Sequence, residues 1–167
     1  FKESVMQKPK IAFIDDEPRI LRSLKMHFRQ SHDVFITTDA TELMEYVSTN
    51  EVQVVISDQR MPDKQGTEVL SDIKAASPNT IRILLTGYAD LNAVMDSVNE
   101  GEIYRYITKP WQNDELKKIV NKATEIAQQT QEITQNTMEN DATQNCVNSG
   151  TVSNRNILVL DDDESVY

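Results

Sequence analysis

Between residues 10 and 108 the chain has five short hydrophobic runs, and each run is followed by a segment in which apolar residues recur at helical spacing. After the first run, for example, Leu21, Leu24 and Phe28 fall on one side of a helix. The five runs cover residues 10–14, 34–37, 52–57, 81–86 and 103–108. This alternation predicts an α/β fold in which a parallel sheet is covered by helices on both faces.

Polar residues and one proline predict where several of the helices begin. Pro18 suits the first turn of the first helix, since it has no amide hydrogen to pair. Asp39 with Glu42 three residues later has the spacing of a capping box. Asp90 is a good N-cap for the fourth helix, and the fifth helix is predicted to start near Asn113.

Beyond Ala127 the composition becomes polar, and Gln, Asn and Thr supply more than half of residues 128–156. Apolar or threonine residues still recur at a spacing of three to four residues from Leu116 to Thr137. Residues 127–155 are therefore predicted to form a polar linker whose first part continues the last helix. Up to about Met138, a fraying helix and a helical seam between two chains are equally compatible with the pattern.

Charge and composition exclude several classes of protein. Acidic residues outnumber basic ones by 27 to 17, and the formal charge is −10, which argues against direct binding of nucleic acid by these residues. No apolar run is long enough to span a bilayer, so no membrane contact is predicted. The one cysteine, Cys146, cannot form an internal disulfide. These features fit a cytoplasmic protein.

Chemically active side chains collect where the predicted strands end. Asp15 and Asp16 follow the first strand, Asp58 ends the third, Thr86 the fourth and Lys109 the fifth. In a doubly wound sheet the first and third strands are neighbours at the point where ligands bind. Three adjacent carboxylates raise one another's pKa unless a cation neutralises them, and Mg²⁺ suits such oxygen ligands. With a hydroxyl and an ammonium group, the set predicts a site for phosphoryl transfer.

This arrangement of two acids, a third acid, a threonine and a lysine resembles the receiver domain of bacterial two-component response regulators, over residues 8–126. The resemblance implies a flavodoxin-like (βα)5 sheet with strand order 2-1-3-4-5. It implies that Asp58 accepts a phosphoryl group from a sensor histidine kinase or a phosphotransfer protein. It also implies that Mg²⁺ is held by Asp15, Asp16, Asp58 and the backbone carbonyl of Arg60.

The resemblance further implies a regulatory switch rather than an enzyme with its own substrate. Thr86 and Lys109 would contact the phosphoryl group, and Tyr106 would turn inward, changing the face formed by helix four, strand five and helix five. That face and the C-terminal helix are two candidate surfaces for a homodimer. By analogy with receivers joined to enzymes of cyclic-di-GMP turnover, the switch would control an output module that these residues do not contain.

Two other classes of protein remain as alternatives. A phosphatase of the haloacid-dehalogenase type also uses an aspartate and Mg²⁺, but its nucleophile and acid lie two residues apart on the first strand. Here residues 15–17 read Asp-Asp-Glu, and no cap domain for a substrate is present. A receiver-like scaffold that works only by dimerisation would not need the complete set of acids, Thr86 and Lys109.

The last twelve residues, NILVLDDDESVY, resemble the start of the predicted domain. Aligned with KIAFIDDEPRIL at a constant offset of 146 residues, Ile157 corresponds to Ile11 and Asp161 to Asp15. Residues 156–167 are therefore predicted to be the first strand and acidic loop of a truncated second receiver, as in a tandem regulator. Because Asp58, Thr86 and Lys109 have no counterparts in residues 156–167, no phosphorylation site is predicted in this segment.

Overall fold

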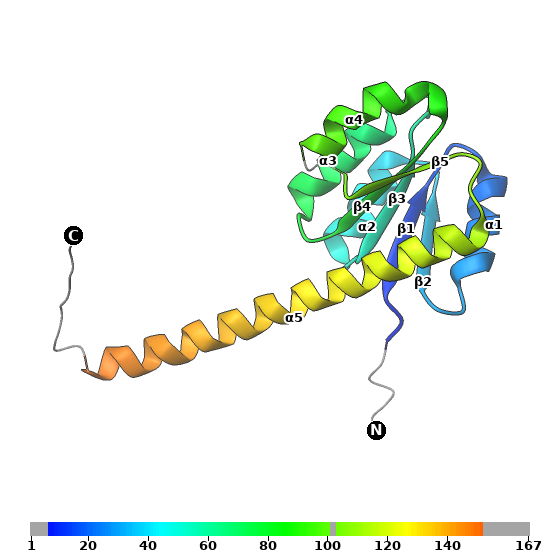
Figure 1. The fold of residues 1–167 in the computed structure, drawn as a ribbon. Helices are drawn as coiled ribbons and strands as arrows, with labels where there is room; N and C mark the ends of the chain where they lie inside the picture. Colours follow the sequence, from blue (N-terminus) through cyan, green and yellow to red (C-terminus); the bar gives the residue numbers. More distant parts are fainter. Residues whose placement is uncertain (1–6, 101–102, 152–167) are drawn as a thin grey trace. The chain divides into compact units, whose positions relative to one another are not determined.

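The computed structural model describes residues 7–100 and 103–151, with the backbone alone for Tyr88 and residues 134–151. The chain divides into one compact unit that ends at Gln129 and a second unit that begins at Thr130. All the strands of the described residues lie in the first unit (Figure 1). The segment predicted to start a second receiver, residues 156–167, lies outside the described residues.

Five parallel strands form a single sheet in the order β2-β1-β3-β4-β5, as predicted. Two strands begin two residues later than their apolar runs, because Val52 and Ile103 are buried in loops that lead into the sheet rather than in the hydrogen-bonded ladder. The strands are β1 (Lys10–Ile14), β2 (Asp33–Thr37), β3 (Val54–Asp58), β4 (Ile81–Thr86) and β5 (Arg105–Thr108).

Helices alternate with the strands, and a short 3-10 turn precedes the fourth helix. Pro18 is the first residue of the first helix, as predicted. The elements are α1 (Pro18–Phe28), α2 (Ala40–Thr49), α3 (Gly66–Ala76), the 3-10 turn η2 (Tyr88–Asp90), α4 (Leu91–Asn99) and α5 (Asn113–Thr151). No helix in the described part of the chain is long and apolar enough to cross a membrane.

The capping box is formed at a different helix from the predicted one. Asp39 does cap α2, but its carboxylate accepts a hydrogen bond from the amide of Thr41, 2.8 Å away, rather than from that of Glu42. A reciprocal capping box forms instead at the start of α3, between Gln65 and Glu68. The prediction for α2 was therefore right in the capping residue and wrong in its partner.

Two hydrophobic cores lie on opposite faces of the sheet. On one face the sheet packs against α1 and the first part of α5, with Phe13, Phe28 and Leu116 fully buried. On the other it packs against α2, α3 and α4, with Leu43 and Leu70 fully buried (Figure 1). Because both faces are covered, only the ends of the strands are free to present polar side chains.

Candidate functional site

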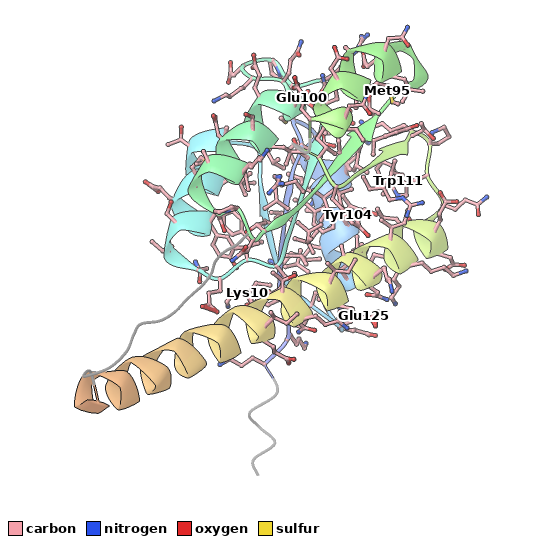
Figure 2. All side chains as sticks on the ribbon, turned by 60° about the vertical axis from the view of Figure 1, so that its left-hand side comes forward. Lys10, Met95, Glu100, Tyr104, Trp111 and Glu125 are labelled. Atoms are coloured by element: carbon pink, nitrogen blue, oxygen red, sulfur yellow. The ribbon has the colours of Figure 1, made fainter. Side chains whose placement is uncertain are left out.

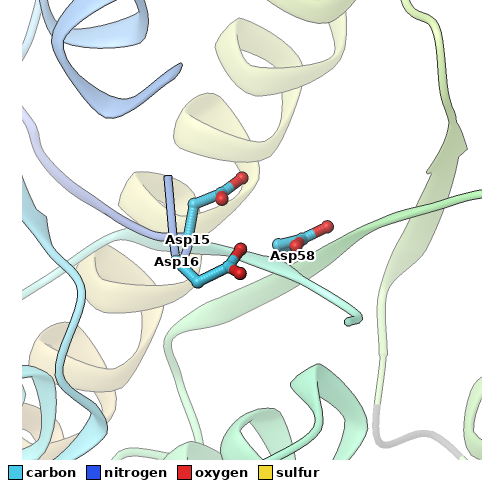
Figure 3. Close-up of side chains that lie close together, drawn as sticks. All are labelled: Asp15, Asp16 and Asp58. Carbon is cyan, nitrogen blue, oxygen red and sulfur yellow. The ribbon is translucent and has the colours of Figure 1, made fainter. Parts of the chain in front are cut away.

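Asp15, Asp16 and Asp58 lie together at the carboxyl end of the sheet (Figure 3). The first two follow β1, and Asp58 is the last residue of β3, which pairs directly with β1. One carboxylate oxygen from each residue lies within 4.8 Å of the others. The neighbouring strands thus bring together the three acids that the sequence placed at separate strand ends.

Asp15 is buried and has one carboxylate oxygen that lacks a protein partner. Its Oδ1 accepts a hydrogen bond from the amide of Glu17 at 2.9 Å, while its buried Oδ2 has no hydrogen-bond partner among the described residues. Burial, with a contribution from the nearby charge of Asp58, raises the pKa of Asp15 to about 6 against the opposing effects of the Glu17 amide and of Lys109. The site therefore favours either a proton or a metal cation beside this oxygen.

Lys109 forms an ion pair with Asp58. Its Nζ lies 2.5 Å from Asp58 Oδ1, and Asp58 is only 4% exposed. Burial raises the pKa of Asp58, while the hydrogen bond and charge of Lys109 lower it. The backbone amide of Lys109 donates to the carbonyl of Thr86 at 2.8 Å, and the peptide bond to Pro110 is cis. Lys109, which follows β5, thus places its ammonium group against the carboxylate of Asp58, the last residue of β3.

Thr86 ends β4 at the same edge of the sheet and is buried. Its hydroxyl donates to the carbonyl of Gly87 at 3.3 Å. Tyr106 lies in β5 opposite Leu84, is half-buried and packs against the core on the α2–α4 side of the sheet. The structure therefore places the predicted hydroxyl at the same edge of the sheet as the acidic site and the predicted aromatic residue further back along the neighbouring strand.

Residues 11–121 match the family described as the response regulator receiver domain. The chain belongs to this family. It is 32% identical over 116 residues to the hydrogenase transcriptional regulatory protein HoxA of Bradyrhizobium diazoefficiens, an alignment that covers 70% of this chain and 24% of that relative. It is 27% identical to the regulatory protein AtoC of Escherichia coli, over 74% of this chain and 27% of the relative. The chain thus spans about a quarter of the curated relatives it matches.

Solved structures of receiver domains have the same fold. The signal receiver domain of an HD domain-containing protein from Pseudomonas fluorescens superimposes with a TM-score of 0.70 at 34% identity, over 76% of this chain and 94% of that one. A structure described as adenylate cyclase from Rhodopirellula baltica gives 0.74 at 28% identity, over 77% and 96%. The receiver domain from Clostridium thermocellum gives 0.65 at 32%, over 70% and 94%. These likenesses confirm the flavodoxin-like (βα)5 sheet of a receiver.

The loop between β3 and α3 packs closely against the end of β3, where Asp58 lies. The amide of Gly66 donates to the carbonyl of Gln59 at 3.0 Å, and the amide of Thr67 donates to the Gln59 side chain at 3.0 Å. A Cβ at position 66 would collide with the carbonyl oxygen of Asp58 and would lie 2.7 Å from Cδ1 of Leu84. The glycine thus allows α3 to approach the backbone of the phosphoacceptor candidate. This role of Gly66 was not predicted from the sequence.

An ion pair between Arg60 and Asp90 was not predicted from the sequence. Arg60 Nε lies 2.8 Å from Asp90 Oδ2, and Nη2 lies 3.0 Å from Oδ1. Asp90 was predicted to cap α4, but its side chain makes no capping hydrogen bond, and its two carboxylate oxygens accept from Arg60 instead. The two residues are thirty positions apart, and no local pattern in the sequence indicates their pairing.

The residues at this site fit a magnesium ion. All three side chains offer carboxylate oxygens, which Mg²⁺ prefers, and the buried Oδ2 of Asp15 needs a positively charged or hydrogen-bonding partner. The raised pKa of Asp15 also indicates that a cation would be favoured here, because the carboxylate is buried and lies close to other acids. The acidic cluster is thus compatible with Mg²⁺, and the cation would lower the cost of keeping the cluster ionised.

Proposed function

We propose that this receiver is phosphorylated on Asp58, in a Mg²⁺-dependent reaction, by the phosphohistidine of a sensor kinase or phosphotransfer protein. The observation that carries the proposal is the position of the Asp58 carboxylate, which lies 2.5 Å from Lys109 Nζ and within 4.8 Å of carboxylate oxygens of Asp15 and Asp16. Receiver domains interact with histidine kinases or phosphotransfer proteins, so the phosphoryl donor belongs to a known class of partner.

In the proposed reaction, a carboxylate oxygen of Asp58 attacks the phosphorus atom of the phosphohistidine. A new O–P bond forms, the P–N bond breaks, and the imidazole leaves with a proton taken from water, so the phosphoryl group moves without any change in oxidation state. Lys109 holds the attacking carboxylate in place and neutralises a phosphoryl oxygen. Mg²⁺, held by the three aspartates and the backbone carbonyl of Arg60, would neutralise further phosphoryl oxygens.

Thr86 and Tyr106 are the two residues proposed to change position in the switch. The Thr86 hydroxyl, which now donates to a backbone carbonyl, would exchange that partner for a phosphoryl oxygen and draw the loop after β4 towards Asp58. Tyr106 would then occupy the space that the loop leaves. The consequence is a change in the face formed by α4, β5 and α5.

The α4–β5–α5 face has the surface chemistry of an interaction site. Met95 on α4 is 39% exposed and Tyr104 before β5 is 40% exposed, and Trp111 lies between β5 and α5 (Figure 2). We place a homodimer on this face or on the C-terminal helix α5. Residues 127–155 would act as the linker and residues 156–167 as the start of a second receiver.

The proposed output is the control of a module outside these residues. The matched relatives include proteins named as transcriptional regulators, an HD domain-containing protein and an adenylate cyclase. The likeness to the receiver of the HD domain-containing protein favours a module of cyclic-di-GMP turnover for this chain. Such a regulator would work in the cytoplasm, where its phosphoryl donors act.

Binding of beryllofluoride, an analogue of the phosphoryl group, tests the proposal. With Mg²⁺ present, ¹⁹F NMR should show one bound beryllofluoride per chain, and both removal of Mg²⁺ and the Asp58→Asn substitution should abolish the signal. Asp63→Asn, on the exposed loop that follows, is the matched control and should bind normally. Binding that survives in Asp58→Asn would contradict the proposal.

The two rival functions give different results with small phosphodonors. A phosphatase of the haloacid-dehalogenase type would turn over many added phosphomonoesters, whereas a receiver would gain one labile phosphoryl group from acetyl phosphate. A dimerisation scaffold would gain none. The close contact between Lys109 and Asp58 favours a phosphorylated receiver, because a protein that acts only by dimerisation does not require a cation beside that carboxylate.

A further inference from the structure

Arg60 and Asp90 join the loop after β3 to the turn before α4. Both nitrogen–oxygen contacts, at 2.8 and 3.0 Å, use separate carboxylate oxygens, so the guanidinium engages the whole carboxylate. Both residues line a surface cavity of about 520 Å³ that also includes the metal-ligand candidate Asp16. Arg60 is the second residue after Asp58. The ion pair therefore connects the edge of the phosphorylation site with the start of α4.

The start of α4 lacks the cap that its sequence could provide. Asp90 occupies the N-cap position, yet its side chain makes no capping bond, and its backbone angles are φ −102° and ψ 1° within the 3-10 turn η2. Asp39 at the start of α2 has φ −120° and ψ 121° and does accept a hydrogen bond from the amide of Thr41. The two aspartates hold equivalent positions, and they differ in backbone conformation and in the partner of the carboxylate.

We propose that Asp90 is a positioning residue with two mutually exclusive partners, the Arg60 guanidinium and the first amides of α4, and that phosphorylation of Asp58 transfers it from the first to the second. This inference rests on the proposed function for the role of phosphorylation, while the choice between the two partners is argued from the ion pair, the missing cap bond and the backbone angles of Asp90. In the second state the turn η2 opens towards the extended backbone of an N-cap, and the Asp90 carboxylate accepts from the amides of Asn92 or Ala93.

Phosphorylation of Asp58 would attract the Arg60 guanidinium away from Asp90. An aspartyl phosphate replaces the single negative charge of Asp58 by between one and two phosphoryl charges, so the site becomes more negative. Phosphoryl oxygens are strong acceptors for a guanidinium group. Arg60 is the second residue after Asp58 and already lines the cavity that includes Asp16.

The two states are balanced finely enough for such a switch. The ion pair is exposed on the Arg60 side, where the side chain is 76% accessible, and exposed ion pairs stabilise proteins only slightly. An N-cap hydrogen bond stabilises a helix by a similar small amount. Because the two contributions are comparable, a change in charge beside Arg60 can invert the preference. The inversion would move the start of α4, which belongs to the face that the switch is proposed to alter.

Amide hydrogen exchange at the start of α4 measures this switch in the full chain. With Arg60→Gln, the amides of Asn92 and Ala93 should exchange about fivefold more slowly, the effect expected for a typical N-cap. Asp90→Ser, which can cap but cannot pair with Arg60, should give the same slowing. The double variant Arg60→Gln with Asp90→Ala should lose it, and Asp96→Ala on the exposed side of α4 should change nothing.

Beryllofluoride with Mg²⁺ should slow the same two amides in the wild-type chain and leave Arg60→Gln with little further change. Unaltered exchange in Arg60→Gln and Asp90→Ser would overturn the exclusive pairing. Unaltered exchange in the wild type despite bound beryllofluoride would overturn the transfer by phosphorylation. If Asp58 binds no beryllofluoride, the proposed function fails and the phosphorylation step fails with it, whereas the two single variants still decide the pairing.

Discussion

The Asp58 carboxylate is subject to two opposing effects. Burial raises its pKa and the Lys109 ammonium lowers it, so the ion pair keeps a buried nucleophile charged. In a Lys109→Met variant without Mg²⁺, the pKa of Asp58 should therefore be higher than in the wild type, as measured by ¹³C NMR titration of its carboxyl carbon. Lys118→Met, an exposed position on α5, is the control. An unchanged Asp58 titration in Lys109→Met would contradict the role given to this ion pair.

His32 gives the domain a pH dependence that is unrelated to phosphorylation. Its ring is 4% exposed and lies within hydrogen-bond distance of the Ser31 and Thr124 hydroxyls, at 2.7 and 3.3 Å. Burial lowers the pKa of His32, and the positive charge of Lys117 lowers it further. The unfolded chain thus binds a proton near pH 6.5 that the folded domain binds only at lower pH.

The contribution of His32 to stability should therefore be complete above about pH 6.5 and decrease as the pH falls towards the folded-state pKa. Urea unfolding between about pH 7 and pH 5 should show a smaller loss of unfolding free energy in His32→Gln than in the wild type. An equally steep decrease in the variant would show that another group causes it.

Gly66 determines how closely α3 can approach the end of β3. An alanine there would press its Cβ against the Asp58 carbonyl and the Leu84 side chain, both in the interior. We expect Gly66→Ala to lower the unfolding free energy by about 1–3 kcal/mol, the usual range for overpacking. Gly87→Ala is the matched control, because a Cβ at that position meets no atom within 4 Å. Equal urea midpoints for the two variants would contradict the steric argument.

The sequence predicted the elements of this fold well, because the strands are continuous apolar runs and the helices have one apolar face. It placed Asp15, Asp58 and Lys109 correctly, since a parallel sheet gathers the carboxyl ends of its strands at one edge. It failed where a distant partner overrode a local preference. Asp90 has the residue type and position of a cap, but Arg60, which is remote in sequence, engages its carboxylate.

At the scale of the whole molecule, the sheet, both cores and the acidic site all lie in the unit that ends at Gln129. A chain truncated after this residue should unfold at the same urea concentration as the full chain and should still bind beryllofluoride with Mg²⁺. Size-exclusion chromatography with light scattering would report whether the removed part of α5 contributes to a dimer. Loss of cooperative unfolding on truncation would show that the domain needs residues beyond this boundary.

Phosphorylation of Asp58 is the claim on which the rest depends. The most direct measurement is the intact mass of the full chain after incubation with acetyl phosphate and Mg²⁺, followed by mapping of the modified residue. We predict the mass increase of a single phosphoryl group, located on Asp58, sensitive to hydroxylamine, absent without Mg²⁺ and absent in Asp58→Asn. A phosphoryl group on another residue, or an unmodified wild-type chain under conditions that modify a known receiver, would contradict the account.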